Sequence, residues 1–101
     1  MKAMICQPMK GKTTEEIKAV REKATKYLES EGYEVVDSFF NPNANDIPEA
    51  NKHKPLYYLS MSMKAMSFCD AVYFCEGWQD YRGCVLEYIA AGTYGLKVIA
   101  E

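Results

Sequence analysis

The 101-residue sequence has no long apolar run, no excess of one charge and no pair of cysteines at metal-binding spacing. Its apolar stretches are only a few residues long, so we expect neither a membrane span nor a signal peptide. The 12 basic and 14 acidic side chains are interspersed and leave no basic surface for a nucleic-acid polymer. With one histidine, His53, and no Cys-x-x-Cys pair, zinc-site spacing is absent. We expect no metal, no cofactor, and no membrane or nucleic-acid partner.

The composition that remains is typical of an ordinary globular domain. Hydrophobic residues make up 49% of the chain and charged residues 26%, and the mean hydropathy is −0.30. At this length the chain is expected to form one domain over residues 1–101 with one modest core. Three of the four cysteines lie in or beside apolar runs, which favours buried reduced thiols and a cytoplasmic location over a secreted disulfide framework.

Short apolar runs alternate with segments of helical periodicity. Strands are predicted over residues 3–6, 33–39, 71–75 and 96–100. The first helix should begin at a capping box formed by Thr13 and Glu16. Two further helices are predicted from Leu56 to near Phe68 and from 83 to 94, the last with Leu86, Ile89 and Ala90 facing the core. Residues 41–55, rich in asparagine and proline, are expected to form an irregular loop.

This order of elements predicts an α/β fold. Alternating strands and helices with continuously apolar strands favour a parallel sheet covered on both faces. Right-handed crossovers then favour a three-layer, doubly wound sheet of about four strands in the order 2-1-3-4, which is Rossmann- or flavodoxin-like. Ligands of such sheets bind at the carboxyl ends of the strands, here between the first and third strands.

The loop after the first strand ends in Gly11-Lys12-Thr13, like the end of a phosphate-binding loop. The first glycine of that motif would fall on Cys6, so the match is incomplete. What remains is a turn that leads into a helix N-terminus, whose free amides attract anions. Gly11 is therefore either a plain turn residue or a ligand contact, and Lys12 is expected to be a solvated charge.

The loop after the third strand is richer in chemical groups. It runs from Glu76 to Gly83 and contains two carboxylates, the only tryptophan, a tyrosine and an arginine. Glu87 follows in the first turns of the next helix, where the helix dipole favours an ionised carboxylate. Its side chain is either solvated or faces a cavity. Trp78 either fills the core or stacks on a base.

Several segments carry a resemblance to a known family: Cys6–Thr13, Gly32–Asp37, Cys69–Trp78 and Arg82-Gly83-Cys84, followed by Glu87. Together they look like a family of small bacterial and phage proteins of unknown function. That family is similar in turn to the nucleoside 2-deoxyribosyltransferases and the related nucleotide N-glycosidases. The resemblance spans nearly the whole chain.

The resemblance implies roles for individual residues. Glu87, four residues after Gly83, would be the nucleophile that attacks the anomeric carbon of the sugar. Glu76, at the end of the third strand, would contact the base or leaving group. The enzymes carry an aspartate at the position of Tyr81, so that Asp80 or Glu76 would be the acid and base. The remaining expected substrate-binding residues are Gln7, Pro8, Met9, Gly11, Trp78, Arg82 and Gly83, with Arg82 suited to a phosphate.

Two functional hypotheses follow for a small-molecule nucleoside or nucleotide partner. The first is cleavage or transfer at the N-glycosidic bond of a (deoxy)nucleoside or its 5′-phosphate, with Glu87 as nucleophile. The second is a non-catalytic module that binds a nucleotide or a nucleotide-derived signal. A chain this short has few residues with which to enclose a pocket, so we expect a homo-oligomer to complete the site. A role as a phage accessory protein that docks on a host enzyme is a third possibility, which no residue favours.

Overall fold

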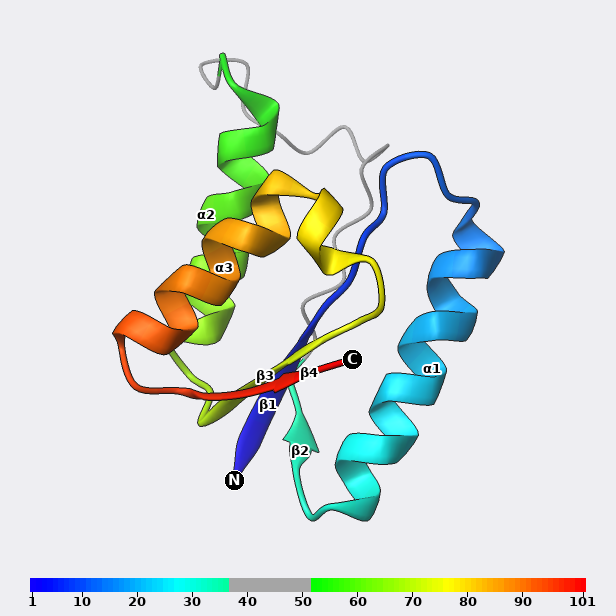
Figure 1. Ribbon diagram of the computed structural model, residues 1–101, viewed down its shortest axis with the longest axis vertical. Coiled ribbons are helices and arrows are strands. Elements are labelled where there is room, and N and C mark those ends of the chain that lie inside the picture. Colours follow the sequence, from blue (N-terminus) through cyan, green and yellow to red (C-terminus); the bar gives the residue numbers. More distant parts are fainter. Residues whose placement is uncertain (37–51) are drawn as a thin grey trace.

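The computed structural model describes residues 1–36 and 52–101 of the chain, which form a four-stranded parallel sheet with helices on both faces (Figure 1). The strands are β1 (Lys2–Cys6), β2 (Glu34–Val35), β3 (Ala71–Phe74) and β4 (Lys97–Ala100). The helices are α1 (Thr14–Ser30), α2 (Lys54–Met66) and α3 (Arg82–Thr93), with a short 3-10 helix η1 (Trp78–Asp80) before α3.

The strand order is β2-β1-β3-β4, and every neighbouring pair is parallel. The predicted Rossmann- or flavodoxin-like α/β topology is therefore confirmed. Most of the predicted loop at 41–55 lies outside the described residues, as do residues 37–39 of the predicted second strand.

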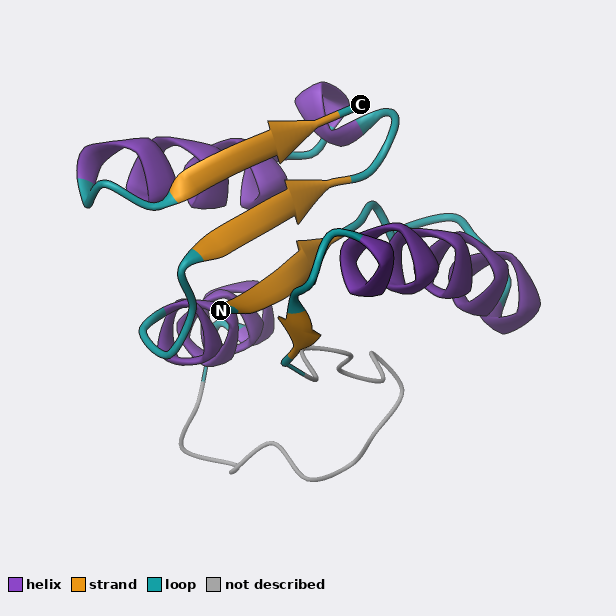
Figure 2. Ribbon diagram, turned by 90° about the horizontal axis from the view of Figure 1, so that it is seen from below, coloured by secondary structure: helices purple, strands orange, loops and turns teal. Residues whose placement is uncertain are grey.

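Two core layers lie on opposite faces of the sheet, because successive side chains of a strand point to opposite sides. Helix α1 covers one face, and α2 and α3 cover the other (Figures 1 and 2). Ala3 and Ile5 of β1 pack in the cluster on the α1 side, whereas Met4 and Cys6 pack in the cluster under α2 and α3. The last residue of β1 therefore presents its side chain to the α2–α3 side.

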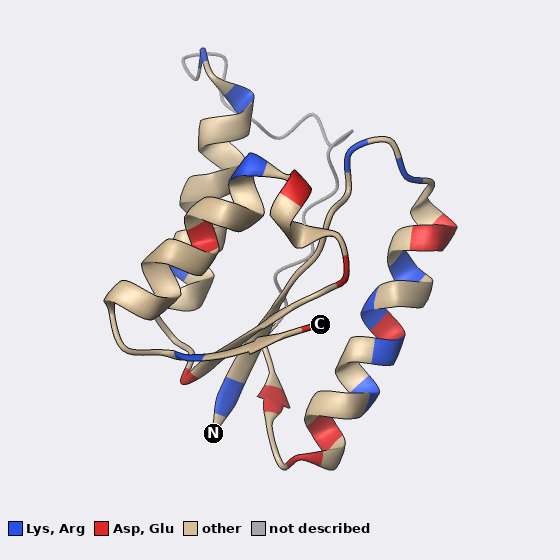
Figure 3. Ribbon diagram, viewed as in Figure 1, with Lys and Arg blue, Asp and Glu red and all other residues tan. Residues whose placement is uncertain are grey.

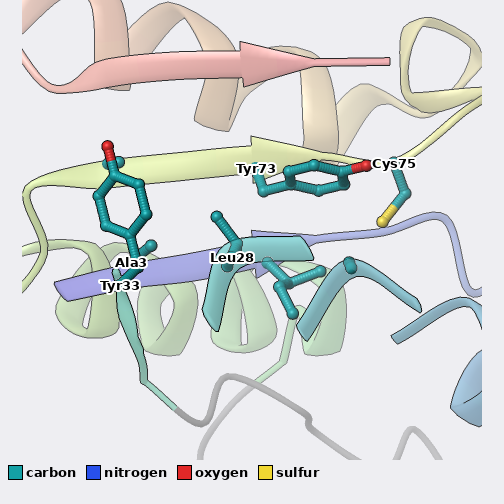
Figure 4. Close-up of a cluster of buried hydrophobic side chains, with 8 residues drawn as sticks. Ala3, Leu28, Tyr33, Tyr73 and Cys75 are labelled. Carbon is teal, nitrogen blue, oxygen red and sulfur yellow. The ribbon is translucent and has the colours of Figure 1, made fainter. Parts of the chain in front are cut away.

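Helix α1 forms as the sequence predicts. The Thr13 hydroxyl accepts a hydrogen bond from the Glu16 amide at 3.1 Å, and the Glu16 carboxylate accepts one from the Thr13 amide at 3.3 Å. This capping box satisfies two backbone groups that would otherwise lack partners. The helix buries Ile17, Ala24 and Leu28, and Leu28 packs in the cluster with Ala3, Tyr33, Tyr73 and Cys75 (Figure 4).

Helix α3 faces the core with a different side from the predicted one. Leu86 and Ile89 are 45% and 56% exposed, while Cys84, Glu87 and Ala91 are buried. The prediction of Leu86 and Ile89 as core residues was therefore wrong. The reason is that α3 carries apolar residues around its whole circumference, so that periodicity does not select one face.

None of the helices in the described part of the chain is both long enough and apolar enough to span a bilayer.

Candidate functional site

A pocket of about 270 Å³ opens at the carboxyl end of β1, between the β1–α1 loop, α2 and the start of α3. This is the switch point of the sheet, where β1 has β2 on one side and β3 on the other. Its lining residues come from three segments that are far apart in the sequence: Gln7, Pro8, Met9 and Lys10; Pro55, Tyr58, Leu59 and Ser62; and Tyr81, Gly83, Cys84 and Glu87.

Glu87 is the carboxylate of this pocket. It is only 6% exposed, although it lies one turn into α3. The Cys6 thiol donates a hydrogen bond to Glu87 Oε2, with a sulfur–oxygen distance of 2.6 Å. Burial raises the pKa of Glu87, and the hydrogen bonds from Cys6 and from the Ser62 hydroxyl act in the opposite direction by favouring the ionised form.

Two buried thiols lie beside this carboxylate. Cys6 ends β1, and Cys84 lies three residues before Glu87 on the same face of α3. The hydrogen bond with Cys84, burial and the charge of Glu87 all raise the pKa of Cys6 above its ordinary value. At neutral pH Cys6 is therefore a protonated thiol that donates to the carboxylate.

The β1–α1 loop is fixed on its other side by contacts to α1. The buried Gln7 side chain donates a hydrogen bond from Nε2 to the Ile17 carbonyl at 2.9 Å. Arg21 Nη1 donates to Gln7 Oε1 at 3.4 Å. Both the amide nitrogen and the amide oxygen of Gln7 are therefore hydrogen-bonded to α1. Gln7 positions the loop as well as lining the pocket.

Tyr81 joins the loop before α3 to the β1–α1 loop. Its hydroxyl donates a hydrogen bond to the Lys10 carbonyl at 3.1 Å across the mouth of the pocket. Gly11 lies in the turn closed by a hydrogen bond from the Lys12 amide to the Met9 carbonyl. Gly11 has a φ of +80° and does not line the pocket, so it is a turn residue rather than a ligand contact.

The structure does not bring the three predicted catalytic carboxylates together. Glu76 is exposed and lines a separate hollow on the α1 side of the β1–α1 loop, near Lys12, Lys23 and Glu101. Asp80 is exposed at the end of η1 and does not line the pocket of Glu87. Among the described residues, Glu87 is the only carboxylate that lines this pocket.

Of the predicted substrate-binding residues, Gln7, Pro8, Met9 and Gly83 line the pocket. Trp78 instead packs against the core, with its ring stacked on Tyr88 at a centroid distance of 4.4 Å. Arg82 is exposed and lines a neighbouring hollow with His53 and Leu86.

The sequence reasoning missed several side chains of the pocket. Tyr58 and Ser62 have a four-residue spacing that places them on one face of α2, where Leu59 also lines the pocket, but the apolar periodicity of this helix predicts only which residues pack in the core. Cys6 and Cys84 were interpreted only as buried thiols. A signal was present, because Cys84 and Glu87 share one face of a predicted helix and Cys6 ends a strand at the switch point.

Comparison with protein-family models finds a match over residues 1–100 to a family described as Domain of unknown function (DUF4406). No curated protein and no solved structure matches the chain.

Proposed function

Because the chain belongs to the DUF4406 family, whose function is unknown, we propose an activity from the site itself. The proposal is cleavage or transfer at the N-glycosidic bond of a (deoxy)nucleoside or its 5′-phosphate, with Glu87 as the nucleophile. The observation that supports it is a buried carboxylate that lines the switch-point pocket and accepts a hydrogen bond from a thiol.

The size and position of the pocket suit a small ligand. Its volume of about 270 Å³ lies just below the range of about 300–1,000 Å³ that is typical of ligand pockets. A ligand held against Met9 and Leu59 would have its sugar within reach of Glu87, since all three residues line the same space. Apolar walls with one carboxylate are suited to an uncharged ring that develops positive charge during the reaction.

The chemistry proceeds in two steps. A carboxylate oxygen of Glu87 bonds to the anomeric carbon as the carbon–nitrogen bond breaks, and the electron pair leaves with the base, which takes up a proton from water. Water or a second base then attacks the anomeric carbon of the glycosyl ester and releases Glu87. Hydrolysis consumes the water, whereas transfer forms a new N-glycosidic bond.

The pocket itself suggests which groups assist the departing base. Asp80 and Glu76 do not line the pocket, but the side chains of Tyr58 on α2 and Tyr81 before α3 do. We assign Tyr58 to contact the base as it leaves, in place of the aspartate that the resemblance implies, and Tyr81 to hold the β1–α1 loop through its hydrogen bond to the Lys10 carbonyl. Cys6 is a positioning residue in this scheme, because it holds the Glu87 carboxyl group.

The test is release of free base from a panel of nucleosides and 5′-nucleotides by the wild type and Glu87→Gln. Loss of the nucleophile should lower the rate by at least roughly 10³-fold. The matched control is Glu22→Gln, which neutralises an exposed glutamate paired with Lys26 on α1 and should retain full activity. Equal activity of wild type and Glu87→Gln would refute the nucleophile assignment.

A second candidate function is binding without turnover. It is favoured by the absence of a second carboxylate from the pocket, among the described residues, to serve as acid and base. Isothermal titration with the same nucleosides and nucleotides distinguishes the two candidates. A binding module should show saturable heat with wild type and Glu87→Gln and release no base from either, and absence of binding to the whole panel contradicts both.

A further inference from the structure

The site contains a second arrangement of groups that glycosidic chemistry does not use. The ligand atoms of Cys6, Cys84 and Glu87 lie within 4.8 Å of one another, and all three residues are buried. They come from two rigid elements, because Cys6 ends the central strand β1 and the other two lie on one face of α3. All four cysteines of the chain are free thiols.

We propose that Cys6, Cys84 and Glu87 bind a thiophilic divalent cation of the zinc class. Cys6 and Cys84 would bind as thiolates, each releasing its proton to the solvent, and with one Glu87 oxygen they would fill three positions of a tetrahedral centre whose fourth position faces the pocket. This assignment goes beyond the proposed function and does not depend on it.

The donor types select the class of metal. Thiolates favour zinc and other soft or borderline ions, whereas Mg²⁺ and Ca²⁺ prefer shells made only of oxygen ligands. Three protein ligands with one open position are typical of zinc sites that bind water or a substrate in the fourth position. Cys84 and Glu87 line the pocket, so the open position has a space to face.

The distance between the donor atoms of Cys6 and Glu87 requires only a local adjustment. In a tetrahedral zinc site, bond lengths of about 2.3 Å to sulfur and 2.1 Å to oxygen place these donors about 3.6 Å apart. The observed 2.6 Å between Cys6 Sγ and Glu87 Oε2 must therefore increase by about 1 Å. A rotation of the Glu87 side chain toward the pocket would supply this shift without moving the backbone of β1 or α3.

The cation and the glycosidic reaction would compete for one carboxylate. Glu87 bound to a metal cannot also attack an anomeric carbon, so the metal-loaded protein should not release base. The metal test below contains no nucleoside and reads the metal directly. Its failure is therefore distinguishable from a failure of the proposed function.

The experiment is titration of the reduced, folded protein with Co²⁺, a spectroscopic substitute for Zn²⁺. Coordination by thiolates gives an intense sulfur-to-cobalt charge-transfer absorption in the near ultraviolet. We expect this band to saturate at one ion per chain and to disappear when Zn²⁺ displaces the cobalt. Cys84→Ser and Glu87→Gln should each weaken cobalt binding by about tenfold or more.

The chain offers matched controls, because Cys69 and Cys75 lie outside the cluster. Cys69→Ser and Cys75→Ser should bind Co²⁺ as the wild type does. Circular dichroism checks the fold of each variant, and Glu87→Gln, which conserves side-chain volume, tests the site without removing a thiol. A folded wild type without the band, or a band that Cys84→Ser and Glu87→Gln leave unchanged, overturns the proposal.

Discussion

The burial of Glu87 affects the stability of the protein as well as its chemistry. Taking a carboxylate out of water disfavours its charged form, and burial raises the pKa of Glu87 above its ordinary value of 4.5. The folded protein therefore holds a proton at pH values where the unfolded chain has already released it. The stabilisation from this group is fully present below the unfolded pKa and is lost as the pH rises through the folded pKa.

A neutral replacement of Glu87 should remove the loss of stability that burial of its carboxylate causes as the pH rises. Relative to the wild type, Glu87→Gln should become progressively more stable as the pH is raised from about 4 to about 7. Urea unfolding midpoints at several pH values measure the difference. Glu22→Gln, at an exposed position of α1, should give a nearly constant difference over the same range. A constant difference for Glu87→Gln as well would show that Glu87 is not buried in an apolar site.

The Cys6 thiol should set the pH range in which Glu87 is ionised. Its hydrogen bond lowers the pKa of Glu87, so Cys6→Ala should raise that pKa further. If the ionised carboxylate is the nucleophile, the acidic limb of the kcat/KM profile should move to higher pH in Cys6→Ala. Cys6→Ser retains a donor and should stay close to the wild type. An acidic limb that does not move in Cys6→Ala contradicts the positioning role.

At the scale of elements, the turn after β3 determines where α3 begins. Gly77 has a φ of +87°, and a side chain there would contact Pro8 Cγ at 3.9 Å. The backbone conformation, rather than this ordinary contact, is what requires glycine. The turn places Tyr81 against Lys10 and brings the first two turns of α3, with Cys84 and Glu87, over the end of β1.

Two glycine substitutions distinguish the need for a left-handed backbone conformation at Gly77 from the effect that adding a side chain has elsewhere in the protein. Gly77→Ala should destabilise the protein by about 1–2 kcal/mol, because alanine disfavours the left-handed conformation. Gly92→Ala, inside α3 with open space around its Cα, should be neutral or should stabilise by up to about 1 kcal/mol. Urea unfolding of both variants measures these effects. Equal destabilisation by both would contradict the explanation from backbone conformation.

At the scale of the whole molecule, charge is distributed unevenly between helices α1 and α3. Charged residues of both signs run along α1, whereas α3 contains only Arg82 and the buried Glu87 (Figure 3). The outer side of α3 instead carries Leu86 and Ile89, which are both exposed. A helix that is apolar on its outer side as well as its inner side is typical of one that packs on both sides.

We expect the homo-oligomer predicted from the sequence to form through this face. Sedimentation equilibrium should give a multiple of the 11.5 kDa chain mass for the wild type. Ile89→Lys should lower the mass toward that of one chain, while Val20→Lys, on the exposed side of α1, should leave it unchanged. A wild-type mass of 11.5 kDa at micromolar concentration would contradict the proposal.

The α/β topology follows from the amino-acid sequence alone. Capping at Thr13, apolar strands and right-handed crossovers leave few alternatives, and they also place Glu87 near the switch point. The tertiary structure decided which chemical groups meet there. It turned Cys84 and Glu87, rather than Leu86 and Ile89, toward the sheet, and it separated Glu76 from Glu87 by the β1–α1 loop. Periodicity could not predict this, because the orientation of a helix that is apolar all around depends on its packing against the sheet, here against β3 and β4.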